Sequence, residues 1–62
     1  MDQTLEQWLI DEGKRAFNAN LTVGTYIARQ EYTLEYRHVL TMQDGWKLAR
    51  DEWASNVEYE YN

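Results

Sequence analysis

The spacing of apolar residues changes along this chain, and the changes constrain its fold more than any other feature. In the first twenty residues, apolar side chains recur three, four, seven and eight positions apart, as on one face of an α-helix. From Leu21 to Leu40 they alternate with polar ones, which is the period of a β-strand. The helical spacing returns from Met42 to Trp53, and alternation returns at Val57. This order of periods predicts an α+β protein.

Two helices are expected. The first covers residues 4–18, with Thr4 as N-cap and Gln7 at the spacing of a capping box. Asn18-Ala19-Asn20 is its expected exit, because Asn tolerates the left-handed conformation that ends helices. Gly13 costs about 1 kcal/mol relative to Ala inside a helix, so it marks a close packing contact or a shorter helix. The second helix covers residues 42–54, with Gly45 early in it and Ser55-Asn56 as its expected end.

The middle of the chain predicts strands. The apolar residues occupy odd positions up to Ile27 and even positions from Tyr32 onward. A single strand would keep one phase, so we expect a turn or bulge near Arg29-Gln30-Glu31. We expect strands at 21–28 and 32–40 that form a hairpin. That turn has no Gly, Asn or Asp, the usual hairpin residues, so one long bent strand is the alternative. Residues 57–62 predict a last strand.

The predicted architecture is a single small domain, residues 1–62, in the order α-β-β-α-β. Its three-stranded sheet is covered on one face by the two helices. The second strand, the second helix and the last strand form a βαβ-like unit with a right-handed crossover. The expected core residues are Leu5, Trp8, Leu9, Phe17, Val23, Ile27, Leu34, Tyr36, Leu40, Trp46, Ala49, Trp53, Val57 and Tyr59.

Composition excludes several classes of protein. The chain has 62 residues and no Cys, so a disulfide scaffold, a Cys-based zinc site and a catalytic thiol are ruled out. No apolar run reaches the roughly 18 residues of a membrane span, and no basic segment precedes an apolar one as in a signal peptide. We therefore expect a cytoplasmic protein. The net charge of −5 disfavours direct binding to nucleic acid or to an anionic membrane surface.

Catalytic arrangements are missing from the sequence pattern. His38 is the single His and has no metal-site spacing around it. Asp11-Glu12 and Asp51-Glu52 are adjacent pairs, which diverge by about 100° on a helix. Ser55 is the single Ser and belongs to no nucleophile motif. We expect no enzyme activity, no cofactor and no metal.

The C-terminal third is the most acidic part of the chain, with five acidic and two basic residues in 44–62. An acidic surface with aromatic residues at its rim suits a basic surface on a larger protein. Small phage and mobile-element proteins often act as nucleic-acid mimics that block such a surface on a host enzyme. By that analogy we expect a stoichiometric inhibitor or regulator of a larger host enzyme, for example one that handles nucleic acid. The predicted partner-binding residues are Asp44, Asp51, Glu52, Glu58, Tyr59, Glu60 and Tyr61.

Two other functions are considered. A structural or accessory subunit would oligomerise or dock through a Tyr-rich sheet face, drawn from Tyr26, Tyr32, Tyr36, Tyr59 and Tyr61. A DNA-binding helix-turn-helix over 22–40 is disfavoured by the neutral charge of that segment and by its period of two. The oligomeric state is left open.

Overall fold

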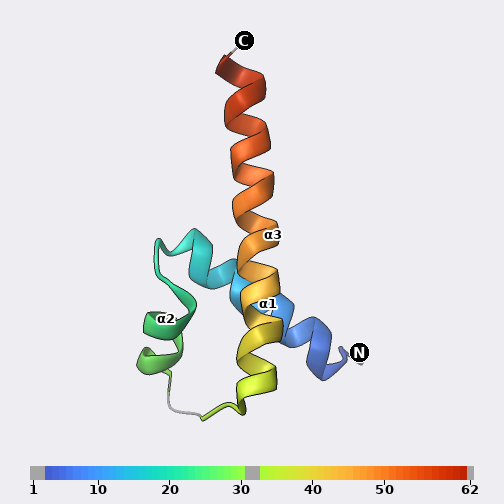
Figure 1. Ribbon diagram of the computed structural model, residues 1–62, viewed down its shortest axis with the longest axis vertical. Helices are drawn as coiled ribbons and strands as arrows, with labels where there is room; N and C mark the ends of the chain where they lie inside the picture. Colours follow the sequence, from blue (N-terminus) through green and yellow to red (C-terminus); the bar gives the residue numbers. More distant parts are fainter. Residues whose placement is uncertain (1–2, 31–32, 62) are drawn as a thin grey trace.

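The computed structural model of the protein consists of three helices (Figure 1). It describes residues 3–30 and 33–61, with side chains up to Asn56. The helices are α1 (Leu5–Asn18), α2 (Val23–Arg29) and α3 (Tyr36–Tyr61). Within these residues there is no strand, so the predicted α+β class, its α-β-β-α-β order and its three-stranded sheet are wrong. The protein is a small all-helical domain.

Helix α1 confirms the expectation for residues 4–18. The Thr4 hydroxyl accepts a hydrogen bond from the backbone N–H of Gln7 (3.1 Å), which satisfies one of the free donors at the helix start. At the other end, Asn20 has the positive φ of 62° expected for a left-handed exit. The N–H of Leu21 bonds to the carbonyl of Ala16, and that of Asn20 to Phe17, which is the Schellman pattern.

Helix α2 replaces the expected strand at 21–28. Thr22 caps it by accepting a hydrogen bond from the N–H of Thr25 (3.2 Å). Val23 is buried, and Tyr26 and Ile27 pack beside it, so the inward positions are i, i+3 and i+4. A separation of four residues, as between Val23 and Ile27, fits both a strand and a helix. The alternation therefore concealed a helical period.

Helix α3 is one continuous element of 26 residues where we expected a strand, a helix and another strand. Helix 42–54 lies inside it, but strand 32–40 is wrong from Tyr36 onward, and strand 57–62 is wrong up to Tyr61. Glu31, Tyr32 and Asn62 lie outside the described residues. The segment 33–35 is neither helix nor strand, so the single bent strand is excluded there as well. The expected end at Ser55-Asn56 does not stop the helix.

Two glycines set the crossing of α1 and α3. A Cβ on Gly13 would overlap the carbonyl oxygen of Met42 and come within 2.8 Å of the Trp46 nitrogen. A Cβ on Gly45 would overlap the carbonyl oxygen of Ile10. The two helices therefore touch backbone to backbone, and each needs glycine at the crossing point. This confirms that Gly13 marks a close packing contact.

The core lies around this crossing. Leu9, Val23 and Met42 form its centre, and Ala16 and Ala49 are buried beside them. The expected core residues Leu5, Tyr36, Leu40 and Trp53 are exposed instead. Tyr36 and Leu40 are four residues apart, so in the helix they share one face of α3, and that face is exposed. The side chains of Val57 and Tyr59 lie outside the described ones.

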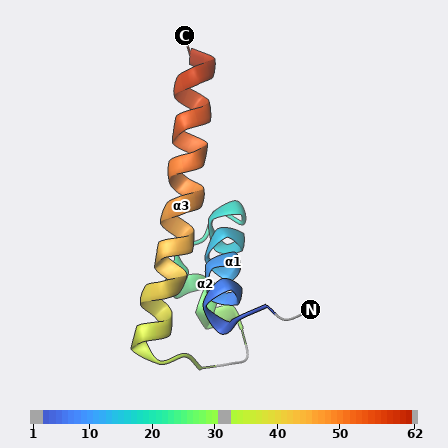
Figure 2. The same ribbon diagram turned by 90° about the vertical axis from the view of Figure 1, so that its right-hand side faces the viewer.

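The C-terminal part of α3 extends beyond the rest of the molecule. Helix α1 and helix α2 pack beside its first half, whereas its last turns stand clear of both in two perpendicular views (Figure 1, Figure 2). The longest dimension is 42 Å, against 26 and 19 Å for the other two. We call residues 51–61 the arm and the remainder the body.

Candidate protein-contact surface on α3

All seven predicted partner-binding residues belong to α3. Asp44, Asp51 and Glu52 are exposed. The side chains of Glu58, Tyr59, Glu60 and Tyr61 lie outside the described ones, and their backbone is helical. The structure thus places the predicted residues on one element, although that element is a helix and not a helix followed by a strand.

The helical register divides this set. Asp44 and Asp51 are seven residues apart, which puts them on nearly the same line along α3. Position 58 continues that line after another seven residues. Positions two apart in a helix diverge by about 200°, so positions 58 and 60 lie on different sides of α3, whereas in the predicted strand they would have shared one face. We call Asp44, Asp51 and position 58 the acidic line.

A cluster of aromatic rings lies where the arm leaves the body. Phe17 meets Trp46 edge-on with ring centroids 5.3 Å apart, and its centroid is 6.5 Å from that of Trp53. The indole N–H of Trp46 donates to the carbonyl of Leu21 (2.9 Å), which ties α3 to the loop between α1 and α2. The Arg50 guanidinium lies 5.7 Å from the Trp46 ring centroid, within range of a cation–π contact. Trp46 is therefore held from several sides.

Trp53 differs from Trp46, because 58% of it is exposed. A hollow of about 270 Å³ lies near Trp46, and another of about 450 Å³ lies beside Trp53. Phe17, Asn18, Asn20, Arg50 and Trp53 line the second one. The sequence placed Trp53 in the core, since it follows Trp46 and Ala49 on one helical face. Phe17, one residue before the end of α1, covers Trp53 only in part.

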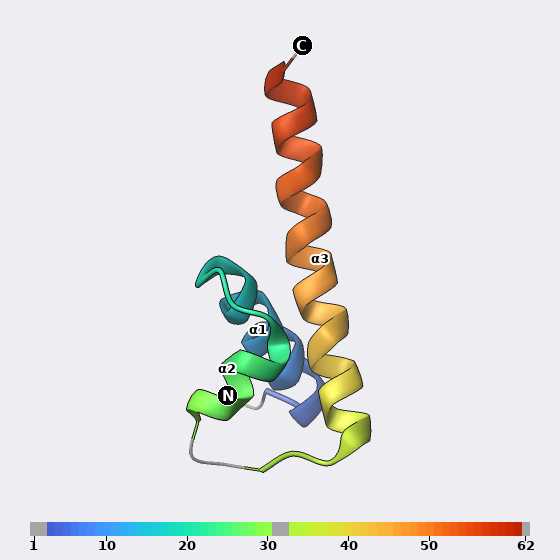
Figure 3. The same cartoon turned by 60° about the vertical axis from the view of Figure 1, so that its left-hand side comes forward.

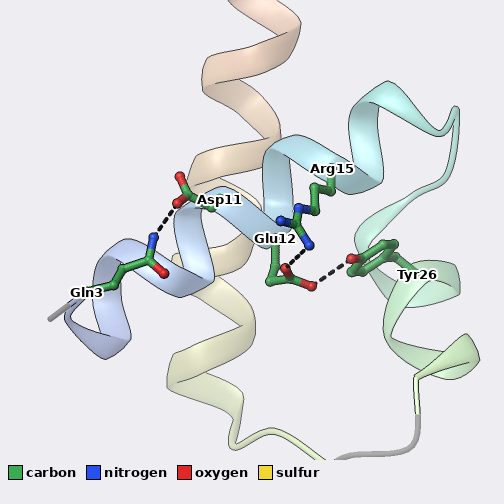
Figure 4. A network of polar contacts seen from close by, with 5 residues as sticks. All are labelled: Gln3, Asp11, Glu12, Arg15 and Tyr26. Atoms are coloured by element: carbon green, nitrogen blue, oxygen red, sulfur yellow. Dashed lines mark hydrogen bonds and ion pairs between the residues drawn. The ribbon is translucent and has the colours of Figure 1, made fainter. Parts of the chain in front are cut away.

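A buried carboxylate joins α1 to α2 (Figure 4). Glu12 is only 6% exposed. It accepts a hydrogen bond from the Tyr26 hydroxyl (2.6 Å) and pairs with Arg15 (3.2 Å). Helix α2 lies beside α1, away from the arm (Figure 3). Sequence reasoning missed this role, although Glu12 follows Leu9 by three positions and precedes Ala16 by four, on the core face.

The other candidate chemistries find little support in the described residues. No group of three or more His, Cys, Asp or Glu side chains among them is placed to hold a metal ion. His38 is half-buried and lines a shallow hollow with Leu5 and Thr41, among others. The segment proposed as a helix-turn-helix does contain two helices, but α2 has a single basic residue, Arg29. In α3, Arg37 pairs with Glu35 at 2.8 Å.

Comparison with known proteins gives no relative: no family model matches the chain, and no curated protein or solved structure is significantly similar to it. Among the described residues, no helix is both long enough and apolar enough to cross a membrane.

Proposed function

We propose that the protein is a protein-binding module that acts as a stoichiometric inhibitor or regulator of a larger protein with a basic surface. One observation carries this proposal. The arm projects from the body, and residues 51–62 contain four acidic residues and no basic one. A negatively charged projection can reach a basic groove that the body is too wide to enter.

The acidic line gives this contact a direction. Asp44 and Asp51 are exposed along α3, and position 58 continues their line into the arm. Asp51 also pairs with Arg50 at 3.3 Å, but an exposed pair of this kind contributes little and is easily exchanged. Charges of one sign along an accessible face steer a partner of the opposite sign and raise its association rate.

Basic surfaces of this shape are typical of proteins that bind nucleic acid, because Lys and Arg neutralise phosphates there. A nucleic-acid-handling enzyme in the cytoplasm is therefore the partner class we propose. The chain would compete with nucleic acid for the enzyme and would carry out no reaction itself. Direct contact with nucleic acid is disfavoured by its net charge of −5.

The test is a pull-down from cell lysate that compares the wild type with two variants of equal net charge. Asp44→Lys/Asp51→Lys changes the acidic line, and Glu6→Lys/Glu35→Lys changes exposed acids of the body. Each double substitution adds four positive units, so the net charge goes from −5 to −1 in both. We expect the first variant to lose a partner that the wild type retains at low salt and releases at high salt.

The second variant should retain that partner, because the acidic line is intact in it. Equal capture by the two variants would contradict the proposed contact surface. Capture that depends on neither salt nor charge would contradict the basic-partner proposal.

A further inference from the structure

A hollow where the arm leaves the body brings three parts of the chain together. It has a volume of about 450 Å³, and we call it the Trp53 hollow. It is lined by Phe17 and Asn18 at the end of α1, Asn20 in the following loop, and Arg50 and Trp53 in α3. Pockets that hold small organic molecules have volumes of about 300–1,000 Å³. The Trp53 hollow is therefore large enough for such a ligand.

Two aromatic rings form the apolar walls of this hollow. Trp53 is 58% exposed, and its ring centroid lies 6.5 Å from that of Phe17 with the ring planes inclined at 59°. At this angle the two rings do not stack on each other, so the exposed part of Trp53 is open to a third ring. Aromatic rings gain stability from offset-stacked and edge-to-face contacts as well as from burial. The walls therefore favour a flat aromatic group.

The polar side chains around the hollow favour an anion. Asn18 and Asn20 carry amide N–H donors, and Arg50 carries a guanidinium. Within the described lining Arg50 is the one charged residue, so the hollow is locally positive in a chain of net charge −5. A planar guanidinium can donate two parallel hydrogen bonds to one carboxylate. A carboxylate is therefore the anion that suits this lining.

Arg50 is positioned for such a ligand and is held only weakly by its neighbour. Its guanidinium lies 5.7 Å from the Trp46 ring centroid, which orients it by a cation–π contact. Its Nε and Nη2 atoms both lie 3.3 Å from the same oxygen of Asp51, a long distance for a charge-assisted hydrogen bond. The two side chains are 49% and 67% exposed, so this pair contributes little. A ligand carboxylate can replace Asp51 on Arg50.

We propose that the Trp53 hollow binds a small aromatic carboxylate, with the ring on Trp53 and the carboxylate on Arg50. The amides of Asn18 and Asn20 supply further donors to the anion. This site is separate from the proposed contact with a basic protein. Trp53 and Asp51 are two positions apart in α3, so they lie on different sides of the helix.

Two neighbouring hollows suit an aromatic carboxylate less well. One of about 260 Å³ also borders Trp53, but both Lys14 and Glu52 line it, so their opposite charges offset each other. The hollow near Trp46 contains Lys47, but its volume is only about 270 Å³ and Trp46 is half-buried. Size, ring exposure and charge therefore coincide best in the Trp53 hollow.

The first test is titration of the purified full chain with naphthylacetate, which joins two fused rings to a carboxylate through one carbon. A ligand of this size in an open hollow should have a Kd on the order of 1 mM. NMR up to about 10 mM ligand covers this range. We expect saturable shifts of the Trp53 indole N–H signal and of the Asn18 and Asn20 amides. No saturable shift at Trp53, or a larger one at Trp46, overturns the proposed site.

The second test separates the carboxylate from the ring. Naphthylacetamide is the matched neutral probe, and we expect it to bind the wild type about fivefold more weakly or worse. Arg50→Gln should weaken binding of naphthylacetate about fivefold or more and leave the amide probe unchanged. Equal binding of the two probes to the wild type overturns the preference for a carboxylate, and this comparison needs no variant.

The third test uses the competition between Asp51 and the ligand. Asp51→Asn removes the group that contacts Arg50, so it should tighten binding of naphthylacetate about twofold. Asp44→Asn is the matched control, because it changes the net charge equally but lies seven residues earlier in α3, and it should leave the Kd unchanged. Equal effects of the two would overturn the role of Arg50. Since these titrations use the purified chain alone, they can fail while capture of a larger partner succeeds, and the reverse.

Discussion

The two halves of α3 have similar sequence patterns and different surroundings. In the body, the apolar face of the helix meets α1, and Met42 is fully buried next to the two crossing glycines. At the start of the arm, Phe17 covers the same face only in part, and 58% of Trp53 is exposed. The difference shows that burial here is set by the length of α1 and not by the pattern on α3. It also separates the part of α3 that stabilises the fold from the part available for contact.

The crossing glycines are expected to give the largest effect on stability. A methyl group at Gly13 or Gly45 would overlap backbone atoms, which cannot move aside as a flexible side chain can. We expect Gly13→Ala and Gly45→Ala each to cost more than about 3 kcal/mol of unfolding free energy. A chain of this size has about 3–9 kcal/mol in total, so the cooperative thermal transition should be nearly lost.

Gly24 is the matched control, because a Cβ at this position meets nothing within 4 Å. Gly24→Ala should raise the unfolding free energy by up to about 1 kcal/mol, since Ala is the better helix former. Thermal melts followed by far-UV circular dichroism measure all three variants. A Gly13→Ala variant that melts like the wild type would contradict the backbone contact at the crossing.

The two Trp residues of α3 compare its halves directly. Trp46→Ala removes a ring that packs on Phe17 and donates to the Leu21 carbonyl, so we expect a loss of about 3–5 kcal/mol. Trp53→Ala removes a mostly exposed ring, and we expect a loss of about 1 kcal/mol or less. Urea unfolding at low protein concentration gives both values. Similar losses would show that the arm belongs to the core.

The link between α1 and α2 is expected to have an intermediate effect. Tyr26→Phe leaves the buried Glu12 carboxylate without its 2.6 Å hydrogen bond, which should cost about 1–2 kcal/mol. Tyr36→Phe is the matched control because Tyr36 is 77% exposed, and it should have no measurable effect. The midpoints of urea unfolding compare the two variants. A Tyr26→Phe protein as stable as the wild type would show that the Tyr26–Glu12 hydrogen bond does not stabilise the fold.

Removal of residues 57–62 is expected to have the smallest effect on the body. These residues follow the last part of α3 that α1 reaches, so the unfolding free energy at low concentration should change by less than about 0.5 kcal/mol. The helical signal per molecule should fall. A large drop in stability of the shortened chain would mean that the arm folds back onto the body.

Local signals in the sequence predicted α1 correctly. Thr4, Gln7 and Asn20 act on neighbouring backbone groups, so their effect does not depend on the rest of the fold. A close packing contact at Gly13 was also predictable, because glycine destabilises the interior of a helix and is expected there only where another element packs closely. The identity of its partner was not, since nothing in the sequence pairs residue 13 with residue 42.

The strands were wrongly predicted for two physical reasons. Val23 and Ile27 are four residues apart, a spacing that both periods share, and the capping role of Thr22 was overlooked. In α3, the alternation after Val57 suggested a strand, but the chain has no Pro and the last Gly is Gly45. A helix already started continues more easily than a new element begins, and Ser55-Asn56 is too weak a signal to stop it.

The candidate site was partly predictable. The acidic character of the C-terminal third is a property of the sequence, and Asp44, Asp51 and Glu52 are exposed as a contact surface requires. The exposure of Trp53 was not predictable, because it depends on where α1 ends relative to α3. The grouping of Glu58 with Glu60 depended on the strand and failed with it.

Native-state amide hydrogen exchange along α3, followed by NMR, tests most directly whether its two halves differ. At low concentration we predict strong protection for amides of residues 42–49, and protection within about tenfold of an unstructured peptide for residues 54–61. Uniform protection along α3 at every concentration would contradict the separation of body and arm.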